Sequence, residues 1–189
     1  MITETNDLQR CFGVGDALYE QYHDTEWGVP VHGDTELFER ITLEGAQSGL
    51  AWITVLRKRE NYRAAFANFD PAVVAEYTEH DVERLMADPG IIRNRLKIAS
   101  TITNARALVA MQQQGESLDE VFWSYAPKRR PKAPATWAEV PSSTPESAAL
   151  AKDLKKRGFV FVGPTTMYAS MQACGLVNDH IKGCVALKR

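Results

Sequence analysis

LMADPGIIRNRLKI, residues 85–98, has the pattern of two helices joined by a short turn. It reads as the end of one helix, a tight turn at Pro89-Gly90, and a second helix with basic residues directly after the turn. Such a hairpin exposes backbone N–H groups at the start of its second helix, where they can hold a DNA phosphate without reading sequence. This is the plan of a helix-hairpin-helix, although Ile92 stands where a second turn glycine is usual. Because every helical protein needs turns with proline and glycine, the stretch alone is a weak indication.

The hydrophobic periodicity of the remaining chain is also helical, which predicts an all-α protein. Further helices are expected over 35–47, 61–69, 71 onward, 93–114 and 144–157. The start signals are a cap at Asp34, a cap at Asp70 before Pro71, and Ser143-Thr144, whose helix Gly158 closes. The apolar stripe of the longest helix is formed by Leu96, Ile98, Ile102, Ala105, Leu108 and Val109. FVFV at 159–162 has the composition of a strand, but nothing else reads clearly as its partner.

Length and charge set the class of protein. At 189 residues, without an internal repeat, the chain is expected to be a single unit over 1–189. It has no apolar run long enough to cross a membrane and starts without an apolar signal region, so we expect a cytoplasmic protein. The net charge is −2, but basic residues gather in three runs, which permit a phosphate-binding face without demanding one. The runs contain Arg57, Lys58, Arg59 and Arg63; Arg93, Arg95 and Lys97; and Lys128, Arg129, Arg130 and Lys132.

Potential metal ligands lie at both ends of the chain, namely Cys11, His23, His180 and Cys184. The H-x3-C spacing of His180 and Cys184 predicts that both fall on one face of a helical turn. Two cysteines with two histidines form a closed tetrahedral zinc set. We therefore expect one structural zinc that joins the terminal segments, about 1–30 and 164–189. Ordinary buried residues are one alternative, and a Cys11–Cys184 disulfide, disfavoured in a reducing cytosol, is another; Cys174 reads as core.

Aromatic side chains cluster in sequence around Glu44, and they are Tyr19, Tyr22, Trp27 and Trp52. Aromatic residues of a helical protein more often form core than a binding surface. A flipped-out base, however, is held by stacking on aromatic faces while a polar group reads its edge. A cationic base would gain further from a π-rich, negatively charged pocket. Gly49-Leu50, just before Trp52, has the form of an apolar wedge that fills the gap left by a flipped base.

Five segments carry a resemblance to a known family: YHDTEWGVP, LEGAQSGLAWITVLRKRENYR, GIIRNRLKI, LKKRGFVFVGPTTMY and MQACGLVNDH. From about Cys11 to Cys184 the chain closely resembles the DNA-3-methyladenine glycosylase I family. That family belongs to the helix-hairpin-helix glycosylases and carries a zinc site joining the termini, which the resemblance places on Cys11, His23, His180 and Cys184. The resemblance implies an N-glycosyl hydrolase of base-excision repair. Such an enzyme acts on double-stranded DNA containing alkylated bases, as a monomer without a nucleotide cofactor, and releases 3-methyladenine.

The resemblance also implies residue roles. Glu44 would contact the polar edge of the base and stabilise charge during catalysis, and Trp52 would stack on the base. Tyr22, Tyr19 and Trp27 would form the pocket wall. The DNA-contacting residues would be Gly49, Leu50, Gly90, Arg93, Arg95 and Lys97. Relatives on this fold often place a catalytic Asp beyond the hairpin, but residues 98–115 contain no carboxylate, in agreement with this family.

Two positions depart from the family pattern. Phe12 stands near the first ligand, where family members often carry a tryptophan, and Ser170 stands where a bulky aromatic is common. A looser pocket wall or adjacent core would change the affinity for the base or admit 3-methylguanine. Two other classes of protein stay open. One is a non-catalytic module that binds alkylated DNA, and the other is a zinc-stapled interaction protein whose aromatic residues are simply core.

Overall fold

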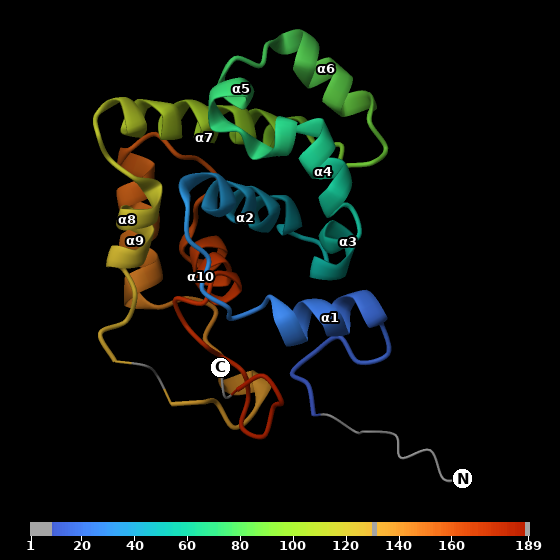
Figure 1. The fold of residues 1–189 in the computed structure, drawn as a ribbon, viewed down its shortest axis with the longest axis vertical. Helices are drawn as coiled ribbons and strands as arrows, with labels where there is room; N and C mark the ends of the chain where they lie inside the picture. The colour runs from blue at the N-terminus through green and yellow to red at the C-terminus, as the bar shows by residue number, and fades with distance from the viewer. Residues whose placement is uncertain (1–8, 130–131, 188–189) are drawn as a thin grey trace.

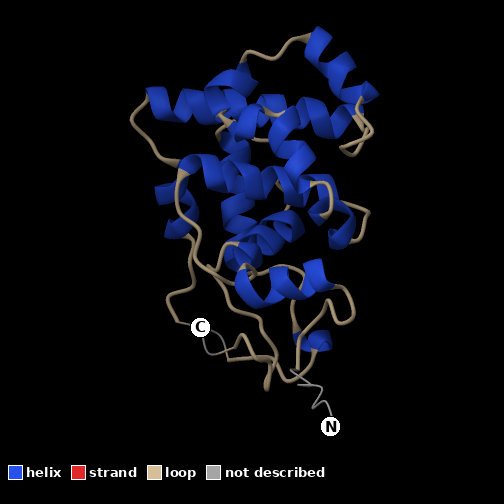
Figure 2. Ribbon diagram, turned by 45° about the vertical axis from the view of Figure 1, so that its right-hand side comes forward, coloured by secondary structure: helices blue, strands red, loops and turns tan. Residues whose placement is uncertain are grey.

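The computed structural model describes residues 9–129 and 132–187. Within these ranges all regular structure is helical, so the expected all-α class is confirmed (Figure 2). None of the described helices is long and apolar enough to span a membrane. The elements are α1 (Ala17–Thr25), α2 (Asp34–Gln47), α3 (Trp52–Leu56), α4 (Arg59–Ala65), η1 (Ala67–Phe69), α5 (Pro71–Ala75), α6 (Glu79–Ala87), α7 (Arg95–Gln113), α8 (Leu118–Ser124), η2 (Trp137–Glu139), α9 (Pro145–Lys156) and α10 (Pro164–Ala173).

Helix α2 lies at the centre of the molecule, and the other helices pack around it (Figure 1). Helices α7, α8 and α10 contact α2 directly, α9 packs on α10, and α5 packs on α7. The apolar face of α2, including Leu37, Phe38 and Leu43, is fully buried. The first and last described segments meet beside α1, on the far side of α2 from α7 (Figure 1). The fold therefore brings α1, the end of α2 and α10 next to the joined termini.

Several helices begin where the sequence predicts. Asp70 accepts backbone hydrogen bonds at the start of α5, and Pro71 is the first residue of that helix. Thr144 caps α9 and shares a reciprocal pair of hydrogen bonds with Ser147. Gly158 follows the end of α9 with a φ of +95°, a conformation that glycine adopts without strain. These polar residues satisfy the backbone groups that helix ends leave unpaired.

The prediction of Asp34 as a helix cap is wrong. Gly33 occupies the cap position of α2, and Asp34 is the first residue of the helix. The Asp34 carboxylate instead accepts hydrogen bonds from the Ser117 hydroxyl at 2.9 Å and from the Asp119 N–H at 3.0 Å. The carboxylate therefore joins the start of α8 to the start of α2 and is not available to cap its own helix.

The longest helix, α7, confirms the expected helix but not all of its stripe. It begins at Arg95, because Asn94 accepts the N–H groups of Leu96 and Lys97. Ile98 and Leu108 are buried as expected, but Leu96 is 69 % exposed, so its placement in the stripe is wrong. Residues 93–96 are all exposed, since the start of α7 projects beyond the helices that cover the rest of it.

Two shorter segments also differ from expectation. The helix expected over 61–69 starts earlier and is interrupted, because α4 ends at Ala65 and residues 67–69 have positive φ angles of 50°, 53° and 59°. Residues 159–162 form no strand. The Asn104 side chain accepts the Val160 N–H at 2.8 Å and donates to the Val160 carbonyl at 3.1 Å. An asparagine of α7 thus takes the place of a partner strand.

Candidate active site and metal centre

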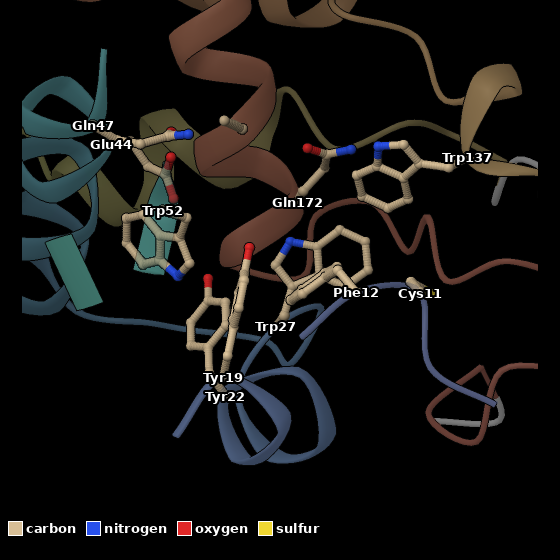
Figure 3. A pocket seen from close by; sticks show the side chains of 11 residues that line it. Cys11, Phe12, Tyr19, Tyr22, Trp27, Glu44, Gln47, Trp52, Trp137 and Gln172 are labelled. Atoms are coloured by element: carbon tan, nitrogen blue, oxygen red, sulfur yellow. The ribbon is translucent and has the colours of Figure 1, made fainter. Parts of the chain in front are cut away.

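A cavity of about 460 Å³ opens between α1, α2, α3, α10 and the loop that carries η2 (Figure 3). Its volume falls in the range of small-molecule sites, about 300–1,000 Å³. The lining residues combine many aromatic rings with a few polar groups, which is the usual composition of a ligand site. They are Cys11, Phe12, Tyr19, Tyr22, Trp27, Glu44, Gln47, Trp52, Trp137, Ala169 and Gln172.

The aromatic residues expected to gather around Glu44 do gather there. The Tyr22 and Trp52 ring centroids are 5.3 Å apart, and both residues are buried. Phe12 lies 4.9 Å from Tyr19 and 5.1 Å from Trp27 by ring centroids. Figure 3 shows Trp52, Tyr19 and Tyr22 next to Glu44, with Phe12 and Trp27 beside the two tyrosines and Trp137 farther along. A planar ligand can therefore lie against aromatic faces.

Glu44 supplies the carboxyl group of the cavity from the last turns of α2. It is 6 % exposed, and burial raises the pKa of its carboxyl group to about 8, while the charge of Arg40 one turn earlier lowers it. Arg40 itself donates to Glu26 at 3.2 Å. At pH 7 the Glu44 carboxyl is therefore mostly protonated in the free protein. A cation bound beside it would favour the ionised form, because opposite charges lower a carboxyl pKa.

The turn between α2 and α3 contains Gly49 and Leu50, the two residues expected to form a wedge. Gly49 has a φ of +81°, and Leu50 is 39 % exposed. The Lys97 ammonium of α7 donates to the Ala46 carbonyl at 2.8 Å and to the Ser48 carbonyl at 2.7 Å. Lys97 thus binds the carbonyl end of α2 and fixes the turn that presents Leu50.

The hairpin of residues 88–94 joins α6 to α7 and is held by α4. The Lys58 ammonium donates to the Pro89 carbonyl at 2.7 Å, and the Ile92 N–H donates to the Tyr62 hydroxyl at 3.1 Å. A Cβ atom at Gly90 would lie 2.8 Å from an Asp88 carboxylate oxygen and 3.1 Å from Asn61 Cβ, so glycine allows the turn to pack closely against both side chains. Ile92, in place of the usual glycine, is accommodated because its backbone is fixed by a tyrosine.

The basic runs differ in how far their charges are available. Arg95 pairs with Glu79 and Glu83, and Lys97 is bound to carbonyl groups. Arg93 is exposed and has no ion pair within the described ranges. In the first run the three arginines pair with acids, as Arg59 does with Glu26, and Lys58 is bound to the Pro89 carbonyl. Arg130, in the third run, lies outside the described residues.

The four expected metal ligands converge on one point. One ligand atom from each of Cys11, His23, His180 and Cys184 lies within 4.8 Å of all the others. Cys184 Sγ is 3.3 Å from His23 Nε2 and 3.4 Å from His180 Nδ1, and Cys11 Sγ is 3.6 Å from His180 Nδ1. A tetrahedral zinc with ligands at 2.0–2.3 Å needs ligand separations of roughly 3.3–3.8 Å. The donor set therefore fits zinc in type, and these three separations fall in that range, while all four atoms lie within 4.8 Å of one another.

In each histidine, the ring nitrogen that points away from the cluster lies at hydrogen-bond distance from an oxygen, as is usual for metal-binding histidines. His23 Nδ1 lies 2.7 Å from the Asp24 carboxylate, and His180 Nε2 lies 3.1 Å from the Trp27 carbonyl. Hydrogen bonds with Arg10 lower the pKa of Asp24 to about 2, which keeps the carboxylate ionised. Such partners fix the tautomer and the ring orientation of metal-binding histidines.

The expected helical turn of His180 and Cys184 is wrong, and the structure also decides against the alternative disulfide. His180 and Cys184 do not share a helical turn, since residues 180–184 follow α10 outside any helix and the Cys184 N–H donates to the Ile181 carbonyl at 2.9 Å. A tight turn brings the two ligands together instead. Cys11, Cys174 and Cys184 are all free thiols, so the alternative disulfide is absent from the described structure, and Cys174 is buried as expected.

Comparison with known proteins identifies the family. Residues 13–187 match the family described as methyladenine glycosylase. The chain belongs to the methyladenine glycosylase family. It is 56 % identical to DNA-3-methyladenine glycosylase 1 of Escherichia coli (strain K12) over 179 residues, which cover 94 % of this chain and 96 % of the relative.

Solved structures of methyladenine glycosylases agree with this fold. A crystal structure of 3-methyladenine DNA glycosylase I, at 56 % identity, has a TM-score of 0.90 and covers 94 % of this chain and 98 % of its own. A variant of 3-methyladenine DNA glycosylase I in complex with 3-methyladenine, at 33 % identity, has a TM-score of 0.88 and covers 95 % of this chain and 97 % of its own.

Four lining residues of this methyladenine glycosylase were missed by sequence reasoning, namely Gln47, Trp137, Ala169 and Gln172. Gln47 follows Glu44 by three residues on the same helix, a spacing that places both on one face and is readable from sequence. Gln172 is oriented by a hydrogen bond to Asp179 at 2.7 Å, and Trp137 comes from an irregular loop, so neither had a local signal. Ser170 is fully buried and is not a lining residue, so its small side chain affects the core and not the cavity wall.

Proposed function

We propose that this methyladenine glycosylase flips 3-methyladenine out of alkylated double-stranded DNA and releases it by hydrolysis. One observation carries the proposal: a buried carboxyl group, Glu44, lies in a cavity lined mainly by aromatic rings. Aromatic faces and a carboxylate together suit a flat cation. The relatives are named for the same base, and one was solved in complex with it.

The chemistry of the lesion explains why this cavity suffices. Methylation at N3 gives adenine a positive charge, so the electrons of the breaking N-glycosidic bond neutralise the departing base. Water then attacks the oxocarbenium-like sugar and releases a proton. Because the leaving base needs no proton, strong general-acid catalysis is unnecessary. Residues 98–115, which follow the hairpin, contain no carboxylate that could act as such an acid.

Glu44 supplies selectivity for a cation over a neutral base. Burial raises the pKa of its carboxyl group to about 8. When a positively charged base binds, the carboxyl group loses its proton and forms an ion pair with the base. Unmodified adenine is neutral and forms no such ion pair. Trp52 and Tyr22 are placed to stack on the base, with Tyr19 and Trp27 completing the wall. Glu44 then stabilises positive charge as it moves from the base to the sugar during bond cleavage.

Extrusion of the base depends on the turn between α2 and α3, which connects the lining residues Gln47 and Trp52. Leu50, presented by the turn that Lys97 holds, would enter the DNA stack, with Gly49 allowing the close approach. The hairpin containing Gly90 is proposed as a helix-hairpin-helix that holds the DNA backbone through its N–H groups. Arg93 is the residue of its basic run best suited to a phosphate, because Arg95 and Lys97 are already bound within the protein.

We further propose that one structural zinc is held by Cys11, His23, His180 and Cys184. The spacing of the donor atoms and the hydrogen bonds of both histidines support it. Four protein ligands leave no position for water or substrate, so the metal would join the two terminal segments to one unit without taking part in bond cleavage.

The test is incubation of the purified protein with methylated DNA, followed by chromatography of the free bases. Release of 3-methyladenine, with 7-methylguanine left in the DNA, supports the proposal. Tight binding to lesion-containing DNA without any base release would instead identify a non-catalytic binding module. Absence of DNA affinity at low salt would identify an interaction protein. The amount of 3-methylguanine in the same chromatogram shows whether the pocket also accepts this base.

A further inference from the structure

Trp137 lines the cavity from a loop between two helices. It belongs to η2, in the proline-rich loop between α8 and α9, and its ring closes one end of the cavity (Figure 3). Its ring centroid is 5.9 Å from Phe12 and 6.0 Å from Trp27. Trp137 is 49 % exposed, whereas Trp27 and Trp52 are 7 % and 9 % exposed. It therefore presents the largest accessible aromatic surface of the cavity.

Core packing does not explain this position. Trp137 also lines a second hollow on the surface, together with Val140, Thr165 and Tyr168. A ring with an open hollow on either side contributes little to the packed core, and an exposed indole at a concave site is typical of a binding surface.

The backbone of the loop nevertheless holds the ring in place. The Lys182 N–H donates to the Pro134 carbonyl at 2.8 Å, and Pro134 is buried. The Ala135 N–H donates to the Glu139 carboxylate at 2.8 Å, which closes the short segment around Trp137. Lys182 lies in the turn between two of the four clustered ligands. The ring is therefore positioned by the same terminal segment that forms the metal centre.

The identity of Phe12 explains what Trp137 adds. Phe12 offers a smaller aromatic face than an indole would. Trp137 packs against Phe12 from the solvent side, which extends that side of the cavity. Indole is also the best aromatic partner for a cation.

We propose that Trp137 is a base-contacting residue of this chain, which stacks on the flipped, positively charged purine and completes the aromatic wall that Phe12 leaves short. The proposal rests on the proposed function, since it assumes that the cavity receives an alkylated base. It predicts that affinity for the base depends on Trp137 and that a larger ring at position 12 makes Trp137 dispensable.

The test compares Trp137→Ala, Trp137→Phe, Phe12→Trp and the double variant Phe12→Trp/Trp137→Ala. Binding of free 3-methyladenine is measured by calorimetry, and base release from methylated DNA by chromatography. Trp137→Ala should weaken base binding about tenfold, in the range found for loss of one base–aromatic stack. The affinity of Trp137→Phe for the base should lie between those of Trp137→Ala and the wild type. The double variant should recover most of the wild-type affinity. Lys132→Ala, in the same loop but outside the cavity lining, is the matched control and should bind the base like the wild type.

The outcomes separate this inference from the proposed function. A wild-type protein that neither binds nor releases 3-methyladenine overturns both. A wild type that binds and releases the base while Trp137→Ala does so equally well overturns only the role of Trp137. The role is also refuted if Trp137→Ala loses affinity for undamaged DNA as strongly as for the free base, because Trp137 would then contact the DNA outside the pocket. Circular dichroism of each variant checks that the half-exposed ring was not needed for folding.

Discussion

Trp27 contacts His180 in two ways. Its carbonyl lies 3.1 Å from His180 Nε2, and its indole packs edge-on against the imidazole with ring centroids 4.6 Å apart. The same indole lines the cavity beside Glu44. One residue therefore belongs both to the wall of the proposed base pocket and to the surroundings of the proposed zinc. The metal should influence catalysis through the shape of that wall.

Replacing one metal ligand tests this connection. Cys184→Ser should lower the zinc content and reduce the free energy of unfolding by about 4 kcal/mol or more, the range for loss of a structural metal. For a chain of this size that corresponds to about 8 °C or more in Tm. Base release should fall only as far as the pocket loosens. Zinc analysis and thermal unfolding measure the first effects, and Cys174→Ala, a buried cysteine outside the metal centre, should keep the metal. Loss of base release in a Cys184→Ser protein that is fully folded and binds DNA normally would refute a purely structural zinc.

Sequence reasoning predicted those parts of the site that have a local signal or a strong resemblance. The four ligands, Glu44 and the aromatic residues of the first third were all placed together correctly. The roles of Asp34 and Lys97 were not readable, because each side chain binds backbone groups of a helix distant in sequence. Trp137 was missed because an irregular proline-rich loop has no hydrophobic periodicity to show which way a side chain faces.

The Lys97 contact predicts a defect in extrusion. Lys97→Met keeps the apolar stem but removes the hydrogen bonds to Ala46 and Ser48, so the turn carrying Leu50 should loosen. Base release from duplex DNA should slow several-fold, while affinity for free 3-methyladenine stays unchanged. The free energy of unfolding should fall by about 1–2 kcal/mol, since hydrogen bonds from a charged donor are lost.

Arg93 provides the contrasting variant on the same hairpin. Arg93→Met should leave stability unchanged but weaken binding to undamaged and damaged DNA alike, and it should flatten the salt dependence of binding. DNA titrations at several salt concentrations measure this slope. If Lys97→Met gave that pattern instead, Lys97 would be a phosphate contact and its bonds to the α2 carbonyls would be secondary.

The raised pKa of Glu44 predicts how stability depends on pH. Burial makes the folded state hold the Glu44 proton more tightly than the unfolded state, with a pKa of about 8 against the ordinary 4.5. The associated stability is present below the unfolded pKa and is lost as pH rises through 8. Between pH 7 and 9 the wild type should lose about 1 kcal/mol more than Glu44→Gln, which has no titrating group at this position. Urea unfolding of both proteins at the two pH values measures the difference.

Single-turnover release of 3-methyladenine by the wild type and by Glu44→Gln, measured across pH 6 to 9, tests the central claim most directly. The wild-type rate at subsaturating enzyme should rise with pH and level off above about 8, because Glu44 must lose its proton to pair with the cationic base. Glu44→Gln should fold, should release the base about 10²-fold more slowly, and should lack this pH dependence. A Glu44→Gln protein that releases 3-methyladenine at the wild-type rate would contradict the role of Glu44 in recognising and stabilising the cation.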